Sequence, residues 1–406
     1  MDTLVIKRKK PRQSNAPKNS LPTLFLPEEL LAEILPFFDV KTVTRLKCLS
    51  KSWMAFISDS NFVQKHLKNS LQNPHLTLFW FQRNCCFNVV PFPVYRLLKN
   101  PGINLYYSRC FHRLKHRLEE SCEFVGSCNG LLCFHNYSET LARTHELCFW
   151  NPATRTTSKK LGSSLCDSNW PDLGIFHFTF GYDASTRTYK VVAFRANENG
   201  GLWKSQVKVF SLGDNCWRNI QSFPVVPFNW LNISCRRLND GVHFSGTVNW
   251  LALDRSITHV KQIVIVSLDL STETYKQFLL PPGFDVVPLF KPVLRVLMDC
   301  LCFSHDSNKT EFVLWQMKEY GVQESWTQLF KINLSYLQMH LPMHKDGFQL
   351  ACLYVNGDRV IFADKFRKRA FIYNLKDKTI ERIKNRNCIH WFDKAKDYVE
   401  SLVSVC

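Results

Sequence analysis

Glycine is scarce in this 406-residue chain, which contains 15 glycines, and no run of about 18 apolar residues occurs in it. The scarcity of glycine and the absence of the G-x-G-x-x-G, Walker and H-E-x-x-H patterns argue against a nucleotide-binding loop or a zinc protease. The first 20 residues lack the apolar region of a secretory signal. We therefore expect an intracellular protein, located in the nucleus, the cytoplasm or both, with no membrane partner.

No C-x-x-C pair occurs among the 16 cysteines, so the spacing that many zinc sites use is absent. In a reducing compartment these cysteines should be free thiols, and most lie in apolar, strand-like runs. The nearest approach to a metal site is Cys110, His112 and His116, where the two histidines share a face if the segment is helical. No second ligand pair follows them, so we expect an ordinary surface segment there, and no metal or cofactor.

Acidic residues are outnumbered, because 34 Asp and Glu face 52 Lys and Arg, which gives a net charge of +18. Part of the excess lies at Lys7–Arg12, in a tail (residues 1–22) that we expect to be disordered, and part lies within residues 364–396. Neither stretch is interleaved with aromatic residues in a nucleic-acid-binding motif. A solvated basic surface is the favoured interpretation. Nucleic-acid binding, and nuclear import through Lys7–Arg12, are the alternatives.

Residues 26–70 have helical periodicity. Pro27 and the two glutamates after it suit the first turn of a helix, and Pro36 should kink or end that helix. Asp39 and Ser50 are candidate N-caps of a second and a third helix, and a fourth starts at residue 59 or 60. Three or four short helices cannot bury all their apolar surface among themselves, so the surplus should face a partner or the next domain. The apolar positions are Leu30, Ile34, Leu35, Phe38, Val43, Leu46, Leu49, Trp53, Phe56 and Ile57.

The same run resembles an F-box, whose plant version reads approximately LP-x-E-L-x-x-E-I-L-x-x-LPVK-x-L-x-R-x-K-CVSKSW-x-x-LI. The matching residues are Leu26, Pro27, Glu29, Leu30, Glu33, Ile34, Leu35, Val40, Lys41, Arg45, Lys47, Cys48, Ser50, Lys51, Ser52, Trp53 and Ile57. The departures are Pro36, Phe38 for Leu, Asp39 for Pro and Leu49 for Val, and none removes the apolar face.

The F-box resemblance implies docking on the Skp adaptor of an SCF ubiquitin ligase, with helical side chains in grooves of the adaptor. Cullin and RING subunits would join through that adaptor. The candidate adaptor-binding residues are Leu26, Pro27, Leu30, Ile34, Leu35, Val43, Leu46, Leu49 and Trp53. Some of them, Trp53 above all, are alternatively part of the small core of the F-box itself.

From about residue 75 the chain consists of short apolar runs rich in Val, Phe, Tyr, Trp and Ile, which are typical of strands. A turn-like segment recurs in it, beginning at Asn151, Asp183, Asp269 and Asn374, in which Asn or Asp precedes a polar turn and a strand restarts at Thr or an aromatic residue. The spacing of roughly 25–60 residues between units favours a β-propeller with variable loops, whose closure removes open strand edges.

This strand-rich region resembles the F-box-associated domain of plant F-box proteins, sometimes named F-box/kelch-repeat. The likeness is carried by residues 126–133 (GSCNGLLC), 150–154 (WNPAT), 180–183 (FGYD), 189–192 (YKVV), 241–243 (GVH) and 249–251 (NWL). Kelch blades carry paired glycines, and the one pair here, Gly200-Gly201, lies in a polar loop. We expect an α+β multidomain chain: an all-α F-box at 23–70, an all-β, kelch-like propeller at 75–390, and a C-terminal tail at 391–406.

Cys128 lies in G-x-C-x-G, the cysteine form of the nucleophile elbow of α/β-hydrolases. An elbow needs a helix after the turn, whereas Gly130 is followed by LLCFHNY, in which no helical period develops. Asn129-Gly130 is instead a strong signal for a two-residue hairpin turn. No histidine with an acidic partner follows in a recognisable context. We therefore predict a hairpin turn and no catalytic residue.

These observations together favour a non-catalytic substrate receptor of a ubiquitin ligase, which binds the adaptor with its helices and an unidentified target protein with its β domain. The alternatives are a basic nucleic-acid-binding protein and a propeller enzyme with a helical cap. Candidate target-binding loops are residues 161–174 and 195–203, both polar and each with a tryptophan.

Overall fold

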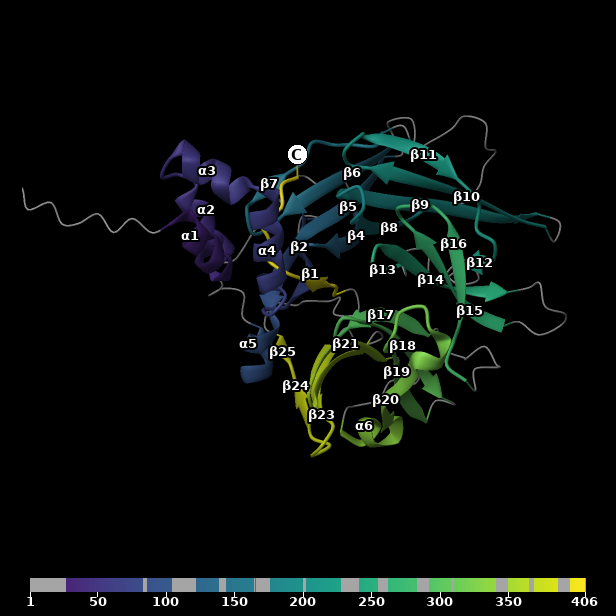
Figure 1. Cartoon of the computed structure of the whole chain (residues 1–406). Helices are drawn as coiled ribbons and strands as arrows, with labels where there is room; N and C mark the ends of the chain where they lie inside the picture. The colour runs from purple at the N-terminus through teal and green to yellow at the C-terminus, as the bar shows by residue number, and fades with distance from the viewer. Residues whose placement is uncertain are drawn as a thin grey trace, which may run out of the picture.

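Short helices lie at one side of a ring of β-sheets in the computed structural model of the chain (Figure 1). The structure describes residues 27–82, 86–103, 122–138, 144–163, 165, 176–199, 202–227, 241–254, 262–282, 292–307, 310–340, 350–364, 369–385 and 395–405. Within these ranges, no helix is long and apolar enough to cross a membrane.

The helical bundle, as we call α1–α4 with η1, comprises α1 (Glu28–Ile34), η1 (Leu35–Phe37), α2 (Val40–Leu46), α3 (Lys51–Ser58) and α4 (Ser60–Ser70). The change from α- to 3-10 geometry comes one residue before Pro36, which confirms that this proline ends the first helix. Asp39 Oδ1 accepts from the Thr42 N–H at 2.9 Å, and Ser50 Oγ accepts from the Trp53 N–H at 3.2 Å. These caps satisfy backbone donors at the helix starts, as the sequence predicts.

Six sheets follow the bundle and form a six-bladed propeller, which confirms the expected fold class. Blade 1 contains β1 (His75–Gln82), β2 (Cys86–Pro93) and β26 (Asp397–Tyr398). Blade 2 contains β4 (Cys122–Cys128), β5 (Leu131–Ser138), β6 (Thr144–Asn151) and β7 (Thr156–Thr157). Blade 3 contains β8 (His177–Asp183), β9 (Thr188–Asn199), β10 (Leu202–Ser211) and β11 (Cys216–Ile220).

The second half of the ring repeats this antiparallel arrangement. Blade 4 contains β12 (Val226–Pro227), β13 (Val242–Phe244), β14 (Thr247–Asp254), β15 (Gln262–Asp269) and β16 (Tyr275–Leu279). Blade 5 contains β17 (Val293–Leu297), β18 (Cys300–Ser307), β19 (Glu311–Met317), η4 (Gln323–Ser325) and β20 (Trp326–Asn333). Blade 6 contains β21 (Leu350–Asn356), β22 (Arg359–Asp364), β23 (Arg369–Asn374) and β24 (Ile380–Arg382).

Three further pieces lie outside the blades. Helix α5 (Val94–Lys99) follows blade 1, and α6 (Leu334–His340) follows blade 5. A parallel pair joins β3 (Gly102–Ile103) to β25 (Lys384–Asn385).

Each pair of neighbouring blades shares a buried apolar core, so the ring is closed by packing. Phe134 and Tyr398 pack between blades 1 and 2, and Phe149 and Phe180 between blades 2 and 3. Corresponding clusters join blades 3 and 4, 4 and 5, and 5 and 6. The last cluster joins blade 6 to blade 1, with Leu76 among its members. The apolar strand faces seen in the sequence therefore bury themselves between blades.

The repeated Asn/Asp segments are hairpin turns, as predicted. Asn151 Oδ1 accepts from the N–H groups of the residues two and three positions on, and Asp183, Asp269 and Asn374 do the same. The residue four positions after each of them has positive φ, between 53° and 63°. The side chain thus holds the turn while the fourth residue takes the left-handed conformation.

The last described residues return to the start of the propeller. Strand β26 pairs with β1 and gives blade 1 the order β2-β1-β26. Thr77 fixes the approach, because its N–H donates to the Lys396 carbonyl at 2.9 Å and its hydroxyl accepts from the Lys396 N–H at 2.9 Å. Residues 395–405, which lie in the stretch designated as a tail from the sequence, complete blade 1 and then pass beside the helical bundle.

Candidate functional site

The helical bundle carries an unusual amount of exposed apolar surface. Its exposed large side chains have solvent-accessible fractions between 46% and 71%, and they are Leu30, Ile34, Phe37, Phe38, Leu49 and Met54. Leu30 and Ile34 lie on the same face of α1, since they are four residues apart. Exposed apolar side chains gathered on one small unit are typical of a protein-interaction site.

The bundle also has a buried core, to which Leu402 from the end of the chain contributes, and the exposed side chains are not part of it. Val40, Val43 and Ile57 are at most 1% exposed and pack with Leu35 and Phe62. Figure 1 shows α1, α2 and α3 close together, with α4 leading from them to β1. The core and the exposed set are therefore separate groups of side chains.

The nine candidate adaptor-binding residues divide between these two groups. Leu30, Ile34, Leu49 and Pro27 are exposed. Leu35 and Val43 are buried in the bundle core, and Leu46 and Trp53 are half-buried against it. Leu26 lies outside the described residues.

Phe37, Phe38 and Met54 are exposed but were not among the nine candidates. Phe37 follows Ile34 by three positions, a helical spacing that Pro36 conceals because it suggests a break before the phenylalanine. The F-box pattern does not single out Met54, because Trp53 is the residue that matches the pattern at this point.

A buried histidine supports the turn that carries the two phenylalanines. His66 of α4 is 1% exposed, and its Nε2 lies 3.0 Å from the Phe38 carbonyl oxygen. Burial lowers the pKa of His66, so the ring is neutral at pH 7 and Nε2–H donates to that carbonyl. The ion pair between Lys65 and Glu33 links α4 to α1 as well. Helix α4 thus holds α1 and the Phe37–Phe38 turn, which carry most of the exposed apolar side chains, in a fixed position.

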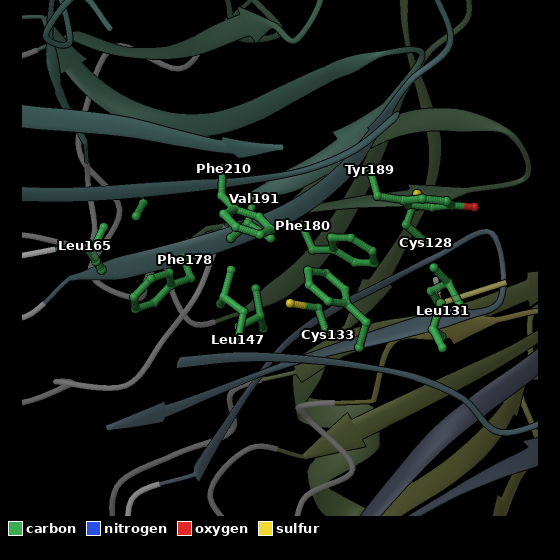
Figure 2. Close-up of a cluster of buried hydrophobic side chains, with 14 of the residues drawn as sticks. Cys128, Leu131, Cys133, Leu147, Leu165, Phe178, Phe180, Tyr189, Val191 and Phe210 are labelled. Carbon is green, nitrogen blue, oxygen red and sulfur yellow. The ribbon is translucent and has the colours of Figure 1, made fainter. Parts of the chain in front are cut away.

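Cys128, the other candidate raised by the sequence, is a buried packing residue. It ends β4, and Asn129 (φ 49°) and Gly130 (φ 81°) form the two-residue turn to β5, as predicted. Figure 2 shows Cys128 in the blade 2–3 core with Leu131 and Tyr189. Burial raises the pKa of its thiol far above the ordinary value, so no thiolate forms at neutral pH.

The nearest histidine does not complete a catalytic arrangement around Cys128. His243 Nδ1 lies 3.6 Å from the Cys128 sulfur, and its Nε2 lies 3.0 Å from the Tyr182 carbonyl oxygen and 3.1 Å from the Tyr182 nitrogen. Burial lowers the pKa of His243. Backbone atoms of Tyr182 therefore hold the ring, and Cys128, Tyr182 and His243 bring together strands of blades 2, 3 and 4.

The remaining sequence candidates lie wholly or partly outside the described residues. Cys110, His112, His116 and Lys7–Arg12 are outside them. Of the loop 161–174, Leu165 is buried, and its carbonyl accepts from Lys208 Nζ at 2.9 Å. The prediction of a loop at 195–203 is wrong for its described residues, because 195–199 belong to β9 and 202–203 to β10, which pair with each other. Arg195 of this stretch is buried, with its guanidinium 4.7 Å from the centre of the Phe176 ring. Within the described ranges, no group of three or more His, Cys, Asp and Glu side chains could hold a metal ion.

Comparison with known proteins assigns both parts of the chain. A family model described as F-box associated beta propeller domain matches residues 106–405, and the F-box domain model matches residues 24–65. An F-box/kelch-repeat protein of Arabidopsis thaliana is 28% identical over 76% of this chain and 79% of its own length. The F-box protein CPR1 of Arabidopsis thaliana is 25% identical over 87% of this chain and 85% of its own length.

Other relatives agree with this assignment, whereas solved structures add little to it. The F-box/WD-40 repeat-containing protein 1 of Arabidopsis thaliana is 26% identical over 79% of this chain and 73% of its own length. A nidogen/laminin complex covers 81% of this chain and 99% of its own at 10% identity and a TM-score of 0.36, a likeness too loose to support a conclusion. The chain belongs to the family of F-box proteins with an F-box associated β-propeller domain.

Proposed function

We propose that this protein is the substrate-recognition subunit of an SCF-type E3 ubiquitin ligase. Its F-box binds the Skp adaptor, which connects it to the cullin and RING subunits, and its propeller binds a target protein for ubiquitination and degradation. The observation that carries the proposal is the set of exposed apolar side chains on a bundle whose core is formed by other residues. The F-box match and the relatives named F-box proteins support the same partner.

The energetics of the exposed set suit a stable protein–protein contact. Fully burying a Leu or Phe side chain contributes about 1.5–3 kcal/mol, so each half-exposed side chain still offers about 1 kcal/mol to a partner. Leu30, Ile34, Phe37, Phe38, Leu49 and Met54 together offer enough to offset part of the entropy lost on association. Leu35 and Val43 act indirectly, since they hold α1 and α2 in place from within the core.

The proposal extends to the face of the propeller on which a target binds. The tight turns at 129–130 and 152–155 lie at one end of blade 2, and Ala153 of the second turn packs against the F-box core. Because antiparallel strands alternate in direction, the C-terminal ends of β5 and β9 and the N-terminal ends of β6 and β10 lie at the opposite face. We place target binding on that opposite face.

The mechanism is proximity rather than catalysis by this chain. Holding the adaptor and the target on one molecule raises the effective concentration of target lysines near the transferred ubiquitin. The buried Cys128 thiol gives no support to the enzyme alternative. We place this activity in the nucleus, the cytoplasm or both, in keeping with the basic stretch Lys7–Arg12.

The double substitution Leu30→Asp and Ile34→Asp tests the proposal. Two carboxylates on this face of α1 cannot enter an apolar groove without losing their hydration, so recovery of a co-expressed plant Skp adaptor should fall at least about tenfold. Adaptor recovery is measured by affinity purification and quantitative immunoblotting. The matched control is Leu279→Asp with Leu329→Asp, two leucines that are each 37% exposed on the propeller. Equal recovery with both double variants would contradict the proposal.

A further inference from the structure

The C-terminal segment, residues 399–405, lies between the F-box and the propeller. Figure 1 shows this yellow end of the chain beside α4 and β7. It leaves β26, the strand that completes blade 1. Ser401, Leu402, Val403 and Val405 are all buried, which is unusual for residues so close to the end of the described chain.

On the propeller side, blade 2 holds this segment through its backbone. Asn151 Nδ2 donates to the carbonyl oxygens of Ser401 at 3.0 Å and Val403 at 2.8 Å. Asn151 is fully buried, and its own Oδ1 caps the turn after β6, so its position is fixed. Val403 and Val405 then pack into the blade 2–3 core, together with the half-buried Val63 of α4.

Gly130 allows the segment to approach the hairpin of blade 2 closely. A Cβ atom at this glycine would lie 2.2 Å from Ser401 Oγ and 2.7 Å from the Val399 carbonyl oxygen. Gly130 also has φ 81°, which side-chain-bearing residues rarely adopt. The Asn129-Gly130 turn, which resembles part of a nucleophile elbow in sequence, therefore packs directly against the C-terminal segment.

On the F-box side, the contact is made by Leu402. It is 4% exposed and packs in the same cluster as Val43, Ile57 and Phe62. The residues on either side of it, Ser401 and Val403, contact the propeller, so neighbouring positions of the segment serve different domains. A single short segment thus contributes to the cores of both domains.

We infer that the C-terminal segment is the positioning element that fixes the orientation of the F-box on the propeller, with Leu402 as its anchor. Domains joined by a linker move relative to one another unless their shared interface is large and apolar. Here α4 and residues 71–74 provide the covalent connection, Ala153 and Val63 add half-buried contacts, and Leu402 adds a fully buried one. If the proposed function holds, this contact between the F-box and the propeller also sets the distance between a bound target and the ubiquitin-transferring end of the ligase.

A distance measurement in the full chain tests the inference without any partner. Spin labels are placed on Cys48, after α2, and on Cys216, at the start of β11, which are both exposed. The other cysteines are replaced by serine, except the buried Cys128, Cys133, Cys148, Cys302 and Cys352. In this background, Leu402→Ala should broaden the distribution of label distances about twofold, because the F-box loses the buried anchor of its contact with the propeller and keeps only the half-buried contacts of Ala153 and Val63.

Two matched pairs separate positioning from a general loss of stability. Leu337→Ala truncates an equally buried leucine at the blade 5–6 core and should leave the width of the distribution unchanged. Gly130→Ala should broaden it by displacing Ser401, whereas Gly246→Ala, at φ 72° with no atom within 4 Å of the added Cβ, should not. Leu402→Met, which nearly conserves volume, should restore the parental width.

The outcomes that overturn the inference are equally specific. If the Leu402→Ala protein folds and its label distances are distributed as narrowly as in the parental protein, the orientation of the F-box does not depend on Leu402. If that variant does not fold, Leu402→Val is measured in its place, and a parental width there overturns the inference too. Adaptor recovery is measured on the same variants: broad distances with intact adaptor binding support both proposals, whereas broad distances in a chain that never binds the adaptor refute the proposed function alone.

Discussion

Cys128 shows how packing decides the chemistry of a residue. The residue is 6% exposed and belongs to a motif that enzymes use, and its sulfur lies within 4 Å of a histidine nitrogen, yet burial keeps the thiol protonated. Nearby glycines, Gly130 and Gly181, allow neighbouring segments to approach the backbone closely. At Gly181, an added Cβ would lie 2.6 Å from the His243 ring, so a glycine is needed where blades 3 and 4 meet.

Thiol reactivity should follow burial. At pH 7.5, iodoacetamide should modify Cys48 and Cys216 within minutes in the native protein, because both thiols are exposed. Cys128, Cys133 and Cys352 should stay unmodified until denaturant is added, since burial raises the pKa of each thiol. Peptide mass spectrometry over a time course gives the rates. Modification of native Cys128 as fast as Cys48 would revive the nucleophile interpretation.

A histidine pair on β5 and β6 makes blade 2 sensitive to acid. His135 Nε2 lies 2.9 Å from His145 Nδ1, and the two rings stack. Burial, with a smaller contribution from His145, lowers the pKa of His135 to about 3. Burial, with a smaller contribution from Arg195, lowers the pKa of His145 to about 4. Both rings are therefore neutral in the folded protein at neutral pH.

This pair predicts that the free energy of unfolding decreases as the pH falls below about 6.5, the ordinary histidine value. The unfolded chain binds protons there while the folded chain does not, so each histidine removes up to about 1.4 kcal/mol per pH unit until its folded pKa is reached. The double variant His135→Leu with His145→Leu removes both hydrogen-bond partners and should make this dependence less steep. The remaining slope comes from His66, His75, His243 and His305, whose pKa values burial also lowers. Urea midpoints measured between pH 8 and pH 4.5 check it, and parallel curves for the variant and the wild type would refute it.

At the scale of the whole molecule, the sequence predicts what depends on local patterns. The helix caps at Asp39 and Ser50 and the turn at Asn129-Gly130 each follow from side chains a few residues apart, and all three were found. The six-bladed ring confirms the propeller expected from repeated turns. Local hydrogen bonds and steric limits act in the same way wherever the segment lies.

The sequence does not predict which side of a short helix faces which neighbour. Leu30 and Leu35 both belong to the apolar pattern of the first helix, but one is exposed and the other is buried in the bundle. Periodicity identifies apolar positions without saying what covers them. The pairing of Leu76 with Asp397 is similarly hidden, because a two-residue strand more than 300 positions away has no recognisable pattern.

The association of the purified chain with a plant Skp adaptor is the most direct test of the account. Isothermal titration calorimetry at several temperatures should show saturable binding with one adaptor per chain. The heat-capacity change should be negative, because Leu30, Ile34, Phe37 and their exposed neighbours leave water. No saturable binding at about 100 μM of both folded proteins, a concentration at which even weak complexes form, would contradict the account.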